Sequence, residues 1–132
     1  MEDRKGQEMK PCLLDTNAVI HWLHKTGKNR IDCDFSTTIF TAIEFPVVTL
    51  FPKVLIVMLS TEAYTRSVEY ACKLREKGSP IPVIDIIIAT IAVEKDAILV
   101  SDDDHFASFN AVEPRLKRIA LETFLSRNAG SE

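Results

Sequence analysis

The sequence has few cysteines, no surplus of positive charge and no long hydrophobic run, and each shortage excludes a class of protein. Its three cysteines, Cys12, Cys33 and Cys72, are far apart and form no C-x-x-C pair, so no zinc site is expected. No apolar run approaches the roughly 20 residues that a membrane-spanning helix needs. Residues 1–10 are charged and polar, unlike a secretory signal. We therefore expect a cytoplasmic protein with reduced thiols, no membrane segment and a loose N-terminal arm over residues 1–10.

The balance of charge argues against a protein that is held on nucleic acid mainly by a basic surface. Sixteen Lys and Arg stand against 19 Asp and Glu, which gives a net charge of −3. A metal-dependent nuclease is not excluded, because its site is itself built from acids. The 132 residues are 46% hydrophobic and 27% charged, which is ordinary for a soluble globular protein. We expect one domain over residues 11–132.

Strands are predicted to alternate with helices along the chain. Strands are expected over 11–15, 35–40, 97–101 and 118–121, whereas 54–59 is either a short strand or the lead into a helix. Helices are expected over 18–23, from 41, over 60–77 and 82–94, from 105, and over 122–127. The apolar face of helix 60–77 is expected to hold Tyr64, Val68, Ala71 and Cys72. This alternation predicts an α/β fold, a three-layer sandwich with a central, mostly parallel twisted sheet.

Asp85 lies in the most apolar stretch of the chain. The run Val83–Val93 is apolar on nearly every side, which predicts a helix buried all round. An ionised carboxylate there needs an Arg, backbone N–H groups or a cation, because losing its hydration costs several kcal/mol. Three adjacent acids, Asp102–Asp104, follow the predicted strand 97–101 and repel one another unless water or a cation screens them. We expect the two places to converge on a divalent metal ion.

Two further acids follow predicted strands, and each has a structural alternative. Asp15 ends the first strand, at the sheet edge where ligands bind in α/β folds. It is equally suited to cap the next helix, for which Thr16 and Asn17 are also available. Thr41-x-x-Glu44 matches a capping box, so Glu44 by itself indicates a helix start rather than a functional site.

The order of these acids resembles the PIN-domain ribonucleases. Four segments are similar to the family's motifs in order: Leu14-Asp15-Thr16-Asn17, Thr41-x-x-Glu44, Asp85-x-x-Ile88-Ala89-x-x-Ala92 and Ser101-x-Asp103-x-His105-Phe106. Ser101 stands where the family usually has Thr. One such motif alone is weak, but four at suitable spacing from about Pro11 to Phe109 are specific.

The resemblance implies a PIN-like fold and an endoribonuclease that needs Mg²⁺ or Mn²⁺ and cleaves single-stranded RNA by metal-activated water. Such proteins are often the VapC-like toxin of a toxin–antitoxin pair, with a small antitoxin partner, and are usually homodimers. The resemblance implies catalytic roles for Asp15, Glu44, Asp85 and Asp103, of which all but Glu44 are also metal ligands. It implies that the residues supporting them by hydrogen bonds are Thr16, Asn17, Ser101 and Asp102.

Within the acidic triplet, the family spacing selects Asp103 as the ligand. Asp102 follows the strand directly and is placed to cap the next turn, and Asp104 is expected to face solvent. His105, beside Phe106 at a helix start, is more often a packing or capping residue than a general acid. Substrate would meet local basic groups, namely Lys25, Lys28, Arg30, Arg66 and Arg115.

Two rival functions remain open. A PIN-like fold with a silent metal site would be a binding or scaffold module in RNA metabolism. A phosphatase with Asp15 as nucleophile would need a second Asp two residues on, where Asn17 stands. Trp22 is expected in the core or an interface rather than as a platform for bases.

Overall fold

The computed structural model describes residues 11–26 and 34–129, in which strands and helices alternate as the sequence predicts. The expected N-terminal arm, Lys28, Arg30 and Cys33 lie outside the described residues. The elements in chain order are β1 (Cys12–Leu14), α2 (Thr16–Thr26), β2 (Phe35–Thr38), α3 (Ile39–Glu44), the 3-10 helix η2 (Pro46–Leu50), β3 (Val54–Val57), α4 (Thr61–Glu76), α5 (Val83–Glu94), β4 (Ile98–Val100), α6 (His105–Val112), β5 (Lys117–Ile119) and α7 (Leu121–Ala129).

The five strands form one sheet in the order β3-β2-β1-β4-β5, and every neighbouring pair is parallel. The prediction of an α/β fold around a mostly parallel sheet is confirmed, and of the two alternatives for 54–59 the strand is observed, over Val54–Val57. Since parallel strands share their direction, the carboxyl ends of β1 and β4, which pair directly, lie at the same edge. Among the described residues, no helix is both long enough and apolar enough to cross a membrane.

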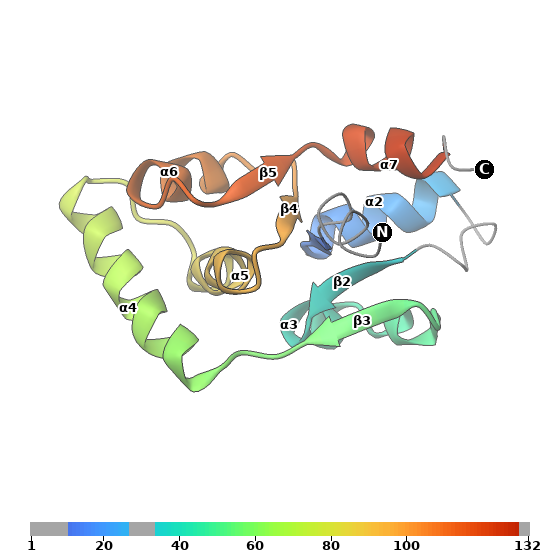
Figure 1. Cartoon of the computed structure of the whole chain (residues 1–132), viewed down its shortest axis with the longest axis horizontal. Coiled ribbons are helices and arrows are strands. Elements are labelled where there is room, and N and C mark those ends of the chain that lie inside the picture. The colour runs from blue at the N-terminus through green and yellow to red at the C-terminus, as the bar shows by residue number, and fades with distance from the viewer. Residues whose placement is uncertain (1–10, 27–33, 130–132) are drawn as a thin grey trace, which may run out of the picture.

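Adjacent residues in the central strands pack into two separate hydrophobic cores, one on each face of the sheet. Leu13 and Leu99 pack with the residues of α4, α5 and α6, whereas Leu14 and Val100 pack with those of α2, α3 and α7. This follows from the two-residue period of a strand, which sends neighbouring side chains to opposite faces. Figure 1 shows α4 and α5 on one side of the sheet and α2 on the other, so the fold has three layers.

Trp22 anchors α2 in the second of these cores. Its side chain is almost fully buried, and its ring meets Phe35 and Phe51 edge to face at centroid distances of 4.8 and 5.0 Å. Such pairs add about 0.5–1.5 kcal/mol to the free energy of burial. Trp22 is therefore a core residue, as expected, and α2 is fixed in its rotation about its own axis.

The predicted apolar face of α4 is wrong. Tyr64 and Val68 are 59% and 63% exposed, and the buried residues of this helix are Ala63, Ser67, Tyr70 and Leu74. The buried face combines small residues, which allow close approach to α5, with two large anchors one turn apart. Ser67 Oγ donates to Thr90 Oγ1 in α5 at 3.2 Å, and the Tyr70 ring lies 4.7 Å from that of Phe109. A prediction from hydrophobicity alone chose the face with Tyr64 and Val68, because two of the residues on the face that is actually buried are the small Ala63 and Ser67.

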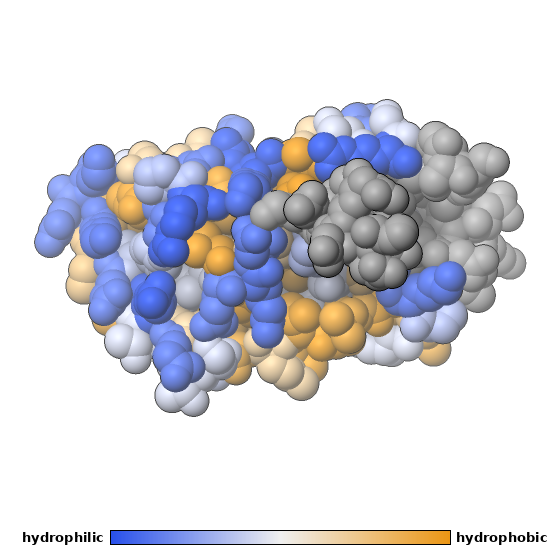
Figure 2. Space-filling view, viewed as in Figure 1, coloured by the Kyte–Doolittle hydropathy of each residue, from blue (hydrophilic) through white to orange (hydrophobic). Residues whose placement is uncertain are grey.

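The helix α5 is also less enclosed than its sequence indicates. Val83 is 68% exposed, so the first turn of the helix reaches the surface, while the following residues from Ile86 to Ala92 are mostly buried. Asp85 lies in that first turn and is only partly buried, which removes the conflict between its charge and a fully apolar environment. Apolar side chains are exposed elsewhere too, among them Ile43 in α3 and Leu55 in β3, and Figure 2 shows hydrophobic surface over these elements.

Candidate metal centre and active site

Asp15 follows β1 and is held from two sides. Its Oδ1 accepts a hydrogen bond from the backbone N–H of Ala18 at 2.9 Å, and its Oδ2 accepts one from Ser101 Oγ at 2.5 Å. Asp15 therefore caps α2, which is the structural alternative that the sequence left open for it. Burial raises the pKa of the Asp15 carboxyl above its ordinary value, although these two hydrogen bonds lower it.

Glu44 lies at the end of α3 rather than near its start. The side chain of Thr38 caps this helix by accepting from the N–H of Thr41 at 3.2 Å, so the N-cap lies three residues before the predicted one and no capping box forms with Glu44. The displacement occurs because β2 ends at Thr38, before the expected strand end. The Glu44 side chain instead forms a hydrogen bond with α2, because Thr16 Oγ1 donates to Glu44 Oε1 at 2.7 Å.

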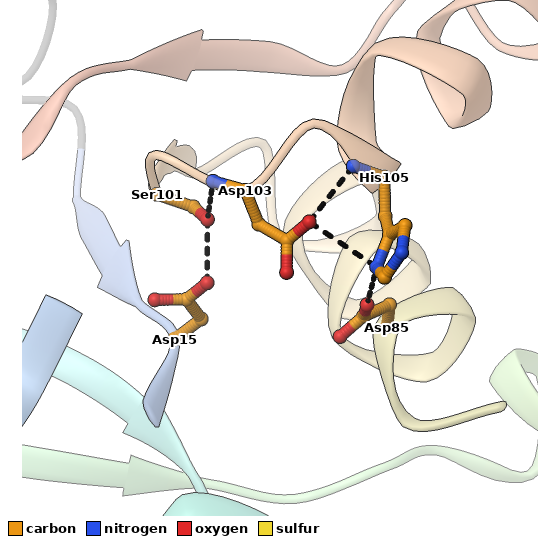
Figure 3. Close-up of polar contacts among 5 residues, drawn as sticks. All are labelled: Asp15, Asp85, Ser101, Asp103 and His105. Carbon is orange, nitrogen blue, oxygen red and sulfur yellow. Dashed lines mark hydrogen bonds and ion pairs between the residues drawn. The ribbon is translucent and has the colours of Figure 1, made fainter. Parts of the chain in front are cut away.

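Asp85, Asp103 and His105 form the tightest cluster of the site. His105 Nδ1 lies 2.7 Å from Asp85 Oδ2 and 3.2 Å from Asp103 Oδ1, as Figure 3 shows. Asp103 also accepts from the N–H of His105, at 2.9 Å, and its own N–H donates to Ser101 Oγ at 3.0 Å. One potential ligand atom from each of the three side chains lies within 4.8 Å of the others.

The structure thus gives His105 a contact that sequence reasoning missed. The ring neither packs in the core nor caps a helix; its side chain is 45% exposed and lies between two acids. The hydrogen bond to Asp85 raises the pKa of His105 above its ordinary value, and the charge of Asp103 adds to this. Burial is the main cause that raises the pKa of Asp85, against which the bond from His105 acts. The only local signal was its position two residues after Asp103.

All four predicted catalytic acids line one cleft of about 220 Å³. They come from four places in the chain: Asp15 after β1, Glu44 in α3, Asp85 in α5 and Asp103 after β4. The cleft is completed by Thr16, Asn17, Ile84 and Ile88. The structure therefore brings together residues as far apart as 15 and 103, as the motifs predict.

Asp102 and Asp104 do not line this cleft. Asp102 Oδ1 accepts a hydrogen bond from the N–H of Leu121 at 3.2 Å, so it anchors the start of α7 and not the next turn. That expectation is wrong because its partner lies far along the chain. Asp104 precedes α6 without a side-chain cap and is exposed, as expected.

The donor set fits a hard divalent cation. Carboxylate oxygens are the ligands that Mg²⁺ and Mn²⁺ prefer. Asp85 and Asp103 raise each other's energy when both are ionised, and a cation between them would remove that repulsion. Asp15 uses one oxygen for Ala18 and the other for Ser101, but each oxygen keeps a lone pair for a ligand or its water.

The fold is a parallel five-stranded sheet between two helix layers, with acids at the carboxyl ends of β1 and β4, and it is consistent with the predicted PIN-like α/β architecture. The structure is similar to a VapBC chain from Salmonella typhimurium in a DNA-bound complex, with a TM-score of 0.70 and 17% identity over 86% of this chain and 99% of that one. It is also similar to a VapBC2 chain from Rickettsia felis bound to a promoter DNA fragment, with a TM-score of 0.67 and 17% identity over 83% and 97%. A VapBC-1 chain from nontypeable Haemophilus influenzae gives a TM-score of 0.67 and 18% identity over 85% and 98%. The sequence itself matches no protein-family model and no curated protein. The resemblance to the PIN-domain proteins is therefore confirmed at the level of the fold.

Proposed function

We propose that this protein is a Mg²⁺- or Mn²⁺-dependent endoribonuclease that cleaves single-stranded RNA by metal-activated water. One observation carries the proposal: four carboxylates from four separate elements line a single cleft. Acids gathered in this way repel one another, and a fold that collects them at the ligand-binding edge of its sheet is suited to a cation. When bound, a divalent ion supplies a nucleophile from water at neutral pH and neutralises charge on the leaving oxygen.

Each side chain has a distinct task in this proposal. Asp85 and Asp103 would hold the metal ion together with Asp15, directly or through water. Glu44 would be a further ligand or a group that orients water, and the hydrogen bond from Thr16 holds its carboxylate toward the cleft. Ser101 fixes the Asp15 carboxylate and the backbone of Asp103 at once.

The fold neighbours support a proposal about partners. Because they are named as VapBC or toxin–antitoxin complexes, we propose that this chain is a VapC-like toxin with a small antitoxin partner. We propose further that it is a cytoplasmic homodimer and that residues 11–132 form one domain. Of the basic groups expected to meet RNA, Lys25 is already paired with Glu122 at 2.5 Å.

A second candidate function has its own supporting observation. His105 already lies between Asp85 and Asp103, so a protonated imidazole would offset one of their two negative charges from within the protein. A site satisfied in this way fits a non-catalytic module of the same fold that binds RNA or protein. The two candidates differ in whether Asp85 and Asp103 bind a divalent ion in place of their contacts with His105.

Cleavage of a single-stranded RNA oligonucleotide with Mg²⁺ or Mn²⁺, and with EDTA, tests the proposal. Wild type is expected to cleave only with the metal, and Asp15→Asn and Asp85→Asn are expected to fold and lose most activity. Asp104→Asn, an exposed acid beside the site, is the matched control and should keep the wild-type rate. Cleavage that persists in EDTA, or full activity of both variants, would refute the proposal. RNA binding without cleavage in all four proteins would favour the binding module.

A further inference from the structure

A second cavity of about 240 Å³ lies beside the acidic cleft. It is lined by Asn17, Ala18, His21, Ser101, Asp102 and Asp103. It shares Asn17 and Asp103 with the cleft, so the two hollows meet along these residues. A polymer with a phosphate in the cleft has this adjoining space available for its neighbouring nucleotide. The second cavity is therefore placed to receive the part of the RNA that adjoins the reacting phosphate.

The wall formed by α2 is rigid and polar. Asn17 and His21 are one helical turn apart and exposed, and the buried Ala18 lines the cavity beside them, while Val19 and Trp22 are buried in the core. Because the burial of Trp22 fixes α2 about its own axis, the helix position from which the His21 side chain reaches the cavity is set. Asn17 offers both a hydrogen-bond donor and an acceptor.

The opposite wall excludes phosphate as the occupant. Asp102 and Asp103 bring carboxylates, which repel an anion and accept hydrogen bonds from hydroxyl or amino groups. A second metal ion is also disfavoured. Among the described residues, the group whose potential ligand atoms lie within 4.8 Å of one another contains Asp85, Asp103 and His105, but neither His21 nor Asp102.

We infer that this cavity binds the sugar and base of the nucleotide next to the cleaved phosphate, with His21 as a substrate-binding residue. The imidazole can stack on a base or donate to its edge, and Asn17 can bond the same base. The carboxylate of Asp102 is placed to accept from a ribose 2′-hydroxyl, a group that DNA lacks. The inference rests on the proposed function and adds to it the residues that select ribonucleotides.

The test compares His21→Ala with His24→Ala, its matched control. His24 is exposed on the same helix one turn further along but does not line the cavity. For a single-stranded RNA oligonucleotide, His21→Ala should raise KM about tenfold, as expected for the loss of one good contact, with kcat within about twofold of wild type. His24→Ala should leave both unchanged. Equal KM values for the two variants would overturn the inference.

A second measurement tests the sugar contact. Single 2′-deoxy substitutions are placed in turn at the nucleotides that flank the cleavage site. Wild type should bind one of the two substituted oligonucleotides about tenfold more weakly than all-RNA, by fluorescence anisotropy in EDTA. Asp102→Asn keeps an oxygen for the N–H of Leu121 and should bind all three alike with unchanged melting temperature. Wild-type indifference to both substitutions would overturn the role of Asp102.

The anisotropy data also separate the two proposals. If wild type binds RNA without cleaving it and His21→Ala weakens that binding, the nucleoside site stands and the nuclease proposal fails. If wild type cleaves RNA and His21→Ala behaves as wild type, the nuclease proposal stands and the nucleoside site fails. If wild type neither binds nor cleaves RNA, both are wrong.

Discussion

Glu113 is buried at the end of α6, and its carboxylate accepts four hydrogen bonds from two residues, whose loss can be measured. Tyr70 donates to its Oε1 at 2.7 Å, and Arg115 donates to both of its oxygens from Nε and Nη2, at 3.0 and 2.9 Å. The N–H of Arg115 donates as well, at 3.0 Å. These bonds join α4 to the turn between α6 and β5. The substitution Glu113→Gln removes the charge and keeps the shape.

The lowered pKa of Glu113 gives the size of the stability loss expected for Glu113→Gln. Its partners, Arg115 first, lower the pKa from its ordinary value of 4.5 to about 2. This corresponds to about 3 kcal/mol of preference for the ionised carboxylate in the folded state. Because the Arg115 side chain is 65% exposed, solvent screens the pair, and we expect Glu113→Gln to lower the free energy of unfolding at pH 7 by about 1–2 kcal/mol.

The sign of the pH dependence follows from the lowered pKa. The unfolded chain binds a proton near pH 4.5 and the folded chain only near 2, so the stabilisation is complete above 4.5 and lost as the pH falls toward 2. Urea unfolding at pH 7, 5, 3 and 2 measures it, and a loss of 1–2 kcal/mol shifts the midpoint by about 0.5–1 M. Glu122→Gln, from the exposed pair with Lys25, is the control and should cost under about 1 kcal/mol. Equal midpoints at pH 7 for Glu113→Gln and wild type would refute the reasoning, as would a difference that persists at pH 2.

Three further outcomes are expected. Burial raises the pKa of Asp85, so its charge opposes folding at neutral pH without metal, and Asp85→Asn should leave the melting temperature unchanged or raise it. Added Mg²⁺ should raise the melting temperature of wild type more than that of this variant, and the reverse order would argue against Asp85 as a ligand. Initial cleavage rates should fall severely for Asp103→Asn, modestly for Asp102→Asn and hardly for Asp104→Asn; if Asp103→Asn kept its rate, the ligand would need reassignment. Val68→Ser should change the free energy of unfolding by no more than about 0.5 kcal/mol in a urea titration, because Val68 is 63% exposed, and a loss above 2 kcal/mol would mean that this face is covered.

The fold could be predicted because each central strand carries its own signal. Leu13–Leu14 and Leu99–Val100 are short apolar runs that end in acids, and the two-faced burial of such runs requires helices on both sides of the sheet. The orientation of α4 could not be predicted in the same way. Its buried face is decided by which residues fit against α5, and Ser67 fits there while Val68 does not.

In the candidate site, too, the features set by strand ends could be predicted and those set by helix packing could not. The acids could be placed from the sequence because Asp15 and Asp103 follow strands that end at one edge. The contact between His105 and Asp85 could not, since it depends on how α5 packs against α6. The start of α3 was missed because Thr38 and Thr41 are equally good caps, and only the length of β2 decides between them.

The hydrogen bond between Asp102 and the N–H of Leu121 bears on when the cleft can form during synthesis of the chain. All four acids of the cleft are translated before α7, but α7 supplies Leu121 and Phe124 to the core and the N–H that anchors the loop before Asp103. A chain that stops at Ala120 holds every acid and lacks that anchor, so it should fold poorly, as circular dichroism would show. On the ribosome, a nascent chain therefore acquires its complete cleft only after α7 has been translated. If the cleft cleaves RNA, this delay keeps the unfinished protein from acting on the message that encodes it.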